Sequence, residues 1–187
     1  TCALPISLTG QSLYAGMYLN EILQKLLPVE EPFAEIWQAY QQCVANMATL
    51  FVDPAQSPYD ITRLKWYLRR FENVLFEQLG YGFDFAKDAL GDLIILSQHY
   101  QYQLQQGFMP VLPLDKTDIA LTGEQLLTWY QCLQDETMFN QMMQQDFDLA
   151  KQLVNSISAM HRHLMDNLLN YQTLQSRELW QQLTRYQ

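Results

Sequence analysis

Cations are scarce in this sequence. Its 187 residues include 11 Lys or Arg against 20 Asp or Glu, which gives a formal net charge of -9 at pH 7. Most of such a surface would repel a polyanion, so the composition argues against nonspecific nucleic-acid binding by this chain. Glycine and proline are also scarce, with seven of each, while 49% of the residues are apolar. These values exclude a disordered or fibrous chain and predict one folded domain over residues 1–187.

Cysteine is scarce as well, and the three cysteines, Cys2, Cys43 and Cys132, lie far apart with no C-x-x-C pair. Neither a disulfide framework nor a four-cysteine zinc site is predicted, and a reducing cytoplasm is favoured. No apolar run reaches the ~18 residues that a membrane span requires. We therefore expect a cytoplasmic protein that does not enter a membrane. Because the chain begins with Thr1, we also expect that an upstream segment has been removed.

The usual catalytic motifs are missing. There is no P-loop, no G-x-G-x-x-G after a strand and no G-x-S-x-G elbow. Of the three histidines, His161 and His163 are two residues apart, and on a helix this spacing points them about 200° away from each other. They cannot share a metal ion there, so structural or surface roles are expected for them and for His99. The sequence predicts a protein that is not an enzyme, with no catalytic residues, no metal and no cofactor.

One metal hypothesis remains open. Asp84, Asp88 and Asp92 recur at four-residue spacing, and together with His99 they could serve a metal-dependent hydrolase. Gly91 interrupts this segment, and the aspartates lack a histidine partner within it. A solvated acidic surface is therefore the favoured interpretation.

Apolar residues recur at helical spacing in several segments, and capping or breaking residues mark most of their ends. The expected helices cover residues 11–27, 30–52, 63–79, a short segment after Thr122, 139–169 and a final segment after Ser176. The expected N-caps are Thr9 or Ser12, Asp60, Thr122 and Ser176, with Gln125 completing a capping box. The second helix should bury a stripe that includes Phe33, Ile36, Trp37 and Tyr40. The segment 139–169 should break near Asp146.

Residues 93–112 follow a different pattern. Polar and apolar residues alternate there, and Gln105-Gln106-Gly107 supplies a turn before Phe108. This pattern predicts a β-hairpin. The expected fold class is therefore mainly α, a helical bundle with a small β-hairpin insertion around residues 93–112.

The expected helix 63–79 carries the most specific feature of the chain. Four of the eleven cations, Arg63, Lys65, Arg69 and Arg70, lie within eight residues of this acidic protein. Leu64, Leu68, Phe71 and Leu75 form an apolar stripe, while Lys65, Arg69 and Glu72 share a neighbouring face that we expect to be exposed to solvent. Gly80 should adopt a left-handed backbone just past the helix end, and Gly82 should allow a second turn. The basic face predicts a site for an acidic partner. The alternative is a core helix whose cations are merely solvated.

Three motifs stand in an order and spacing that resemble the bacterial RecO family of DNA repair proteins. They are the segment Leu13-Tyr14-Ala15-Gly16-Met17-Tyr18-Leu19-Asn20-Glu21 preceded by Leu4-Pro5, the segment Leu68-Arg69-Arg70-Phe71-Glu72 with Leu79-Gly80-Tyr81-Gly82, and Ser176-Arg177-Glu178-Leu179. Gly107-Phe108 and Leu121-Thr122-Gly123 also look similar to the central region of the family. The resemblance is to the helical domain of RecO, without the OB-fold that precedes it in the family.

The resemblance implies a non-catalytic recombination mediator of the RecF pathway. Such a protein anneals complementary strands and, with RecR, helps to load RecA onto DNA coated by single-stranded-DNA-binding protein. In the family, the helical domain receives the acidic, Phe-ended C-terminal tail of that coating protein. The helix with the L-R-R-F motif is implicated, so Arg69 with Leu68 is the first choice for the tail site.

The chemistry of such a site extends it to the neighbouring residues. A terminal carboxylate and preceding Asp residues suit a guanidinium fork, and a terminal aromatic ring suits an apolar slot. Arg69 or Arg70 beside Leu68 and Tyr67 could supply both, with Lys65 nearby. Arg177 is a possible secondary contact, and the alternative for it is a salt bridge near a helix start.

The sequence departs from the family in two respects. Some members hold a four-cysteine zinc site in the segment corresponding to Phe85–Phe108, which here contains no cysteine, so zinc is not expected. Many members are basic before the S-R-E-L motif, whereas residues 167–175 contain no cation. Contact with single-stranded DNA would therefore fall mainly to the missing OB-fold. A second hypothesis stays open, a helical scaffold that binds a globular partner such as RecR without recognising the tail.

Overall fold

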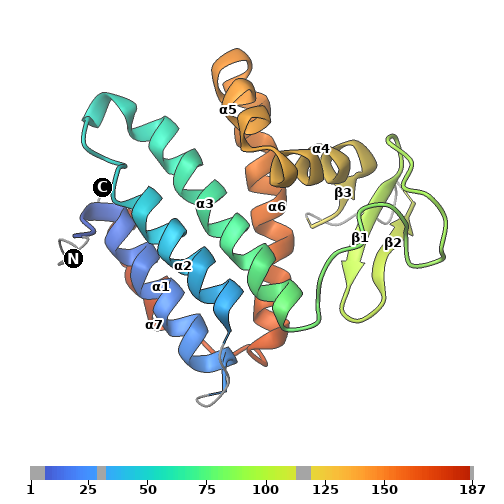
Figure 1. Ribbon diagram of the computed structural model, residues 1–187, viewed down its shortest axis with the longest axis horizontal. Helices are drawn as coiled ribbons and strands as arrows, with labels where there is room; N and C mark the ends of the chain where they lie inside the picture. Colours follow the sequence, from blue (N-terminus) through green and yellow to red (C-terminus); the bar gives the residue numbers. More distant parts are fainter. Residues whose placement is uncertain (1–6, 29–32, 113–118, 186–187) are drawn as a thin grey trace. The chain divides into compact units, whose positions relative to one another are not determined.

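A computed structural model describes residues 7–28, 33–112 and 119–185 of the chain (Figure 1). The elements are α1 (Gly10–Leu26), α2 (Ala34–Met47), a 3-10 turn (Pro54–Gln56), α3 (Ser57–Gln78), β1 (His99–Gln103), β2 (Gly107–Val111), β3 (Leu121–Thr122), α4 (Gly123–Gln134), α5 (Glu136–Gln145), α6 (Phe147–Leu168) and α7 (Gln175–Arg185). The predicted class, mainly helical with a small β-hairpin, is confirmed.

Backbone contacts divide the chain into two compact units. Unit 1 consists of Thr1–Phe71 and Met165–Gln187, and unit 2 consists of Glu72–Leu164. The two boundaries fall inside α3 and α6. That residues 1–187 form one domain stays a prediction.

Unit 1 has its core between α1, α2 and the first part of α3, which lie side by side in Figure 1. Its fully buried side chains include Leu19, Ile22, Met47 and Trp66. Ser12 does not cap α1, since its buried hydroxyl donates to the Met47 carbonyl at 2.8 Å and so ties α1 to α2. Thr9 occupies the N-cap position of α1, but its side chain makes no capping hydrogen bond.

The predicted stripe of α2 is wrong at one position. Ile36 is buried as expected, but the Trp37 side chain is 60% exposed. Its ring stacks instead on Tyr40, with 5.6 Å between the ring centroids. The expected start of this helix at Glu30, Glu31 and Pro32 lies outside the described residues.

The start of α3 also differs from the prediction. The helix begins at Ser57, six residues before Arg63, so Asp60 lies in its first turn and is not its N-cap. The Asp60 carboxylate accepts a hydrogen bond from the Phe51 backbone N–H at 2.9 Å. Phe51 has a left-handed backbone with φ +63°. Asp60 therefore stabilises the turn that leads into α3.

The end of α3 confirms the prediction for Gly80. Gly80 has φ +84°, the Tyr81 N–H donates to the Phe76 carbonyl at 2.7 Å, and the Gly80 N–H donates to the Glu77 carbonyl at 3.0 Å. These two bonds form a Schellman motif, in which a left-handed glycine satisfies the last carbonyls of a helix. Gly82 is not at positive φ, so a left-handed turn there is not required.

Unit 2 contains a three-stranded antiparallel sheet in the order β2-β1-β3. In the predicted hairpin, Tyr102 pairs with Phe108, and the turn between the strands places Gln105 and Gly107 at positive φ. Residues 93–98, which we predicted as strand, lie outside the sheet, although Leu93 forms an isolated antiparallel bridge with Lys87. The Phe83 ring packs against Tyr102 at 4.9 Å and Phe108 at 5.8 Å between centroids, so an aromatic cluster fills the core beside the sheet.

α4 begins at its predicted cap, whereas α5 begins at Glu136 with Asp135 as its N-cap, three residues before the predicted start. The Thr122 hydroxyl accepts from the Gln125 N–H at 3.1 Å, and the Gln125 side chain accepts from the Thr122 N–H at 2.9 Å, which confirms the capping box of α4. The predicted break near Asp146 is also confirmed. Asp146 separates α5 from α6, and its carboxylate accepts from the Leu149 N–H at 3.0 Å.

Candidate partner-binding site on α3

The structure brings the predicted site residues together along about two turns of α3. Lys65, Tyr67, Leu68, Arg69 and Arg70 all belong to this helix, and each of their side chains is half-buried. The predicted exposed face is therefore only partly in contact with solvent. Partial burial restricts the long cationic side chains, and a restricted cation loses less entropy when it binds an acidic group.

Arg70 is held by a neighbour that the sequence analysis missed. Its guanidinium lies over the ring of Trp66, with 5.6 Å from the guanidinium carbon to the ring centroid. Trp66 is fully buried, so the contact takes place in a partly desolvated setting, where a cation–π contact is stronger than in water. The i, i+4 spacing of Trp66 and Arg70 could have predicted this contact, because residues four apart are neighbours on a helix.

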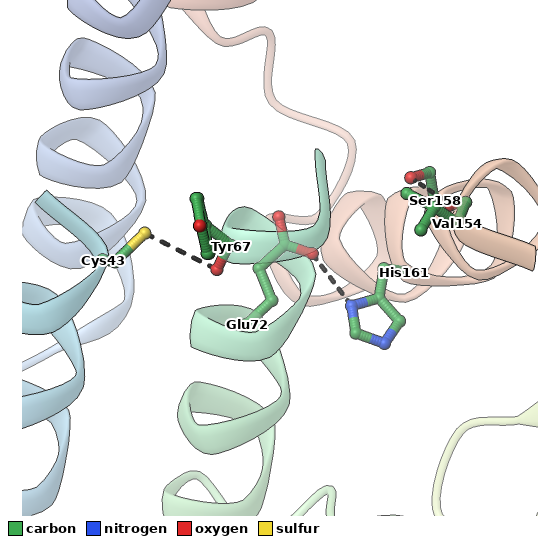
Figure 2. A network of polar contacts seen from close by, with 6 residues as sticks. All are labelled: Cys43, Tyr67, Glu72, Val154, Ser158 and His161. Carbon is green, nitrogen blue, oxygen red and sulfur yellow. Dashed lines mark hydrogen bonds and ion pairs between the residues drawn. The ribbon is translucent and has the colours of Figure 1, made fainter. Parts of the chain in front are cut away.

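The apolar stripe is confirmed at Leu64, Phe71 and Leu75, which are buried, but Leu68 is only half-buried. Leu68 therefore keeps part of its apolar surface available beside Arg69. On the side of α2, the Cys43 thiol lies 3.5 Å from the Tyr67 carbonyl oxygen (Figure 2). This contact helps to fix the backbone of residues 65–70 of α3.

Glu72 was predicted on the exposed face, and that prediction is wrong. The Glu72 and His161 side chains are both 0% exposed, and Glu72 Oε2 lies 3.0 Å from His161 Nδ1 (Figure 2). The imidazole also packs against the Phe76 ring at 5.0 Å and the Phe83 ring at 5.5 Å. A partner for the carboxylate explains its burial, since a buried charge must be paired. His161 is thus a structural residue of unit 2.

Arg177 takes part in a salt bridge, one of the two roles weighed for it. Its guanidinium donates to the Asp166 carboxylate and lies 5.8 Å from the ring centroid of Tyr18. Burial opposes the charge, but the bond to Asp166 prevails, and the pKa of Arg177 lies above its ordinary value. Its contact with a partner tail stays a prediction.

Two of the motifs that resemble RecO meet in unit 1. The Glu21 carboxylate accepts hydrogen bonds from the Gln175 N–H at 3.0 Å, the Ser176 N–H at 3.0 Å and the Ser176 hydroxyl at 2.7 Å. Ser176 was predicted to cap α7, but the helix begins at Gln175 and the cap is supplied by α1. The motif ending at Glu21 and the motif starting at Ser176 therefore have a shared structural role.

Removing the Glu21 cap is expected to weaken the protein in a pH-dependent way. Burial acts to raise the pKa of Glu21, but the hydrogen bonds from Ser176 and Gln175 prevail and lower it. The carboxylate therefore stabilises the folded chain above the ordinary glutamate pKa, and the contribution is lost as pH falls through the lowered folded pKa. We expect Glu21→Gln to cost about 1 kcal/mol at pH 7. The cost should shrink as the pH falls below the ordinary glutamate pKa and through the lowered folded pKa.

Urea unfolding of both proteins at several pH values measures this difference. Glu77→Gln, at an exposed position near the end of α3, is the matched control and should change stability by less than about 0.5 kcal/mol. A cost for Glu21→Gln that is the same at pH 7 and pH 3 would show that the ionised carboxylate is not what caps α7.

The aspartates of the metal hypothesis serve turns. Asp84 accepts from the Ala86 and Lys87 N–H groups, and Asp88 accepts from the Leu90 and Asp92 N–H groups. Within residues 7–28, 33–112 and 119–185, no three His, Cys, Asp or Glu side chains gather as a metal site requires. In the same ranges, no helix is long and apolar enough to cross a membrane.

The cysteines that the structure describes are poorly placed for chemistry. Cys43 and Cys132 are both buried thiols outside any disulfide, while Cys2 lies outside the described residues. Burial, assisted by the nearby charge of Asp135, raises the pKa of Cys132 to about 11. A thiol with such a pKa stays protonated and is a weak nucleophile at neutral pH.

The chain is similar to bacterial proteins named DNA repair protein RecO. It is 31% identical over 176 residues to the DNA repair protein RecO of Pseudoalteromonas translucida, and 32% identical over 176 residues to that of Psychromonas ingrahamii. Each match covers 94% of the chain. A RecO of Enterobacter sp. is 33% identical over 125 residues, which is 66% of the chain and 48% of that protein. No family model matches.

The chain belongs to the RecO family. It spans 64% of the length of the Pseudoalteromonas protein and 65% of the Psychromonas protein. The resemblance stated from the three motifs is thereby confirmed, and the activity and partners of a whole RecO protein are considered below as proposals.

Proposed function

We propose that this chain is the helical part of a DNA repair and recombination mediator, and that it docks the acidic C-terminal tail of single-stranded-DNA-binding protein on α3. The docking site consists of Lys65, Tyr67, Leu68, Arg69 and Arg70. The mediator role rests on homology to proteins named DNA repair protein RecO. The tail site rests on the chemistry of α3.

The observation that carries the tail site is a cluster of half-buried cations on a strongly acidic chain. Four of eleven cations lie between Arg63 and Arg70, although the net charge is -9. An acidic tail would be repelled by most of the surface and attracted to this turn, which favours one binding register. The stacking of Arg70 on Trp66 holds one guanidinium in place.

Each part of the tail has a group that suits it. Arg69 offers a planar fork for the terminal carboxylate, and Lys65 lies one turn away for a preceding Asp. The half-buried Leu68 and Tyr67 offer apolar contact for a terminal Phe ring. A few charged hydrogen bonds and one aromatic ring typically support micromolar binding, about -8 kcal/mol.

The remaining functions proposed for the chain follow from the family. In this proposal the protein is not an enzyme and works in the cytoplasm. It acts with RecR in strand annealing and in loading RecA. Contact with single-stranded DNA falls mainly to the OB-fold domain that precedes the helical domain in RecO. The low content of cations fits that division, since strand binding by this chain alone would oppose its net charge.

Fluorescence anisotropy with a labelled peptide ending in Asp-Asp-Ile-Pro-Phe tests the tail site. We expect saturable micromolar binding that weakens as salt is raised. Arg69→Ala should weaken binding by roughly 10- to 100-fold, because a charged hydrogen bond contributes about 1.5–3 kcal/mol. A peptide without the terminal Phe should bind the wild-type chain about as weakly as the full peptide binds the Arg69→Ala variant.

Arg162→Ala is the matched control, because Arg162 is an exposed arginine of α6 far from this turn in the sequence. It should leave binding unchanged within about twofold. If Arg162→Ala and Arg69→Ala weaken binding equally, only the overall charge matters. If the wild-type chain shows no binding up to high micromolar peptide, the scaffold hypothesis, in which the helices bind a globular partner such as RecR, replaces tail docking.

A further inference from the structure

The loop between α3 and β1 (Figure 1) carries several exposed aliphatic side chains. Leu90 is 65% exposed, Leu93 71%, Ile95 59% and Leu96 57%, and all four lie within seven residues of unit 2. Isolated exposed aliphatic residues are common, but a cluster of four on one loop is typical of an interaction surface. These four residues are called the apolar loop below.

The apolar loop is held in place by hydrogen bonds. The Ala89 N–H donates to the Phe108 carbonyl at 2.9 Å, and the Ile94 N–H donates to the Ala86 carbonyl at 3.1 Å. The Ile95 N–H donates to the Tyr100 hydroxyl at 2.9 Å. A loop fixed in this way cannot easily turn its aliphatic side chains inward, and a partner would pay little entropy to order it.

Its far end is fixed as well. The Leu96 carbonyl accepts from the Glu124 N–H at 3.0 Å, and the Gln98 carbonyl accepts from the Gly123 N–H at 2.8 Å. These bonds join the loop to the first turn of α4. The exposed side chains therefore project from a loop that is tied to both the sheet and a helix.

Charge decides which partner fits. Asp84 and Asp92 are exposed and Asp88 is half-buried, while Lys87 is the one cation between residues 84 and 112. The apolar loop is thus rimmed by net negative charge. A partner with Lys or Arg around an apolar centre would be attracted, because complementary rims guide docking.

The same charge disfavours the other occupants. A second copy of the chain would place like aspartates against each other on two proteins of net charge -9. An anionic membrane surface and a nucleic acid are also negative and would be repelled. We propose that the apolar loop docks a basic, amphipathic protein segment, with Leu93 and Leu96 as the central contacts.

This surface is distinct from the tail site. It belongs to unit 2, it is apolar and acidic, and its proposed occupant is basic, whereas α3 offers cations to an acidic tail. The two proposals can therefore fail independently.

The probe is a helical peptide of Leu and Lys, about 18 residues or five turns long, with all Leu on one face. Two control peptides separate the contribution of charge from that of the apolar face. One is a Leu and Glu peptide with the same apolar face, and the other is a scrambled Leu and Lys peptide without one. Amide chemical shifts of the isotope-labelled 187-residue chain are followed during titration. We expect the amphipathic Lys peptide to change the amide chemical shifts of residues 84–96 in a saturable way. Both control peptides should bind at least about tenfold more weakly.

Two variants and one control complete the test. Leu93→Ser and Leu96→Ser, both at exposed positions, should each weaken binding by roughly tenfold. Val52→Ser, at a position 82% exposed in unit 1, should leave it unchanged. The proposal is overturned if the Lys peptide does not bind, if the shifts lie outside the loop, or if the Glu peptide binds equally well. It is also overturned if sedimentation shows a dimer of the chain that Leu93→Ser dissociates, since a second copy would then be the occupant.

Discussion

His161→Ala is expected to destabilise the chain by about 3–5 kcal/mol. The substitution removes the imidazole whose Nδ1 lies 3.0 Å from Oε2 of Glu72, a carboxylate that is 0% exposed. It also leaves a void beside the rings of Phe76 and Phe83. Loss of this partner from a buried carboxylate and the opening of a cavity both raise the free energy of the folded state, so urea unfolding should show a large fall in midpoint.

A matched histidine tests whether the pair is responsible. His163 is exposed on the same helix, so His163→Ala should change stability by less than about 0.5 kcal/mol. Replacing both members of the pair with apolar residues, as in Glu72→Met with His161→Leu, should restore much of the stability lost in His161→Ala. If the double variant is as unstable as the sum of the single variants, packing and not the buried charge dominates the site.

Gly123→Ala is expected to destabilise the chain by about 3 kcal/mol or more. A Cβ atom at Gly123 would lie 2.1 Å from the Ile95 carbonyl oxygen and 2.7 Å from its carbonyl carbon. Both are backbone atoms that cannot rotate away as a side chain can. The loop would have to move from the first turn of α4 and weaken the bond from the Gly123 N–H to the Gln98 carbonyl. Thermal or urea unfolding measures the loss.

Gly82→Ala is the control for the same exchange. Its added Cβ would meet Glu77 at 3.6 Å, an ordinary van der Waals distance, and Gly82 is not at positive φ. We expect a change of less than about 1 kcal/mol. Equal losses for the two variants would mean that the close approach of Ile95 to Gly123 does not govern the first turn of α4.

Local signals predicted three helix ends correctly. The capping box at Thr122 and Gln125, the glycine after α3 and the break at Asp146 depend on residues within a few positions of each other. Such residues bind the backbone N–H and C=O groups at a helix end, which lie within a few positions of them in the sequence. Helical periodicity likewise located Leu64, Phe71 and Leu75 in the core.

The errors arose where a distant residue decides the outcome. Glu72 has the spacing of a surface residue, and its burial depends on His161, which is 89 residues away. The cap of α7 comes from Glu21, which is 155 residues from Ser176, so the local Ser signal pointed to the wrong group. Trp37 was assigned to a buried stripe by periodicity, although no neighbour covers it enough to bury it. Periodicity gives the face of a helix but not what packs on it.

The candidate site on α3 could be predicted only in part. The cluster of Lys65, Arg69 and Arg70 is visible in the sequence, and so is its contrast with the acidic chain. The partial burial of these cations and the stack of Arg70 on Trp66 depend on tertiary packing. The structure also gives two of the motifs a shared role, since Glu21 and Ser176 hold α1 to α7.

Mapping of the tail peptide on the chain by amide chemical shifts tests tail docking most directly, because it reports where the peptide binds as well as whether it binds. We expect a peptide ending in Asp-Asp-Ile-Pro-Phe to shift the amides of residues 65–70, with the Arg69 side-chain N–H among the largest changes. The amide chemical shifts of the apolar loop should not change. Shifts spread over other surfaces, with residues 65–70 unaffected at saturation, would contradict the assignment of α3 as the tail site.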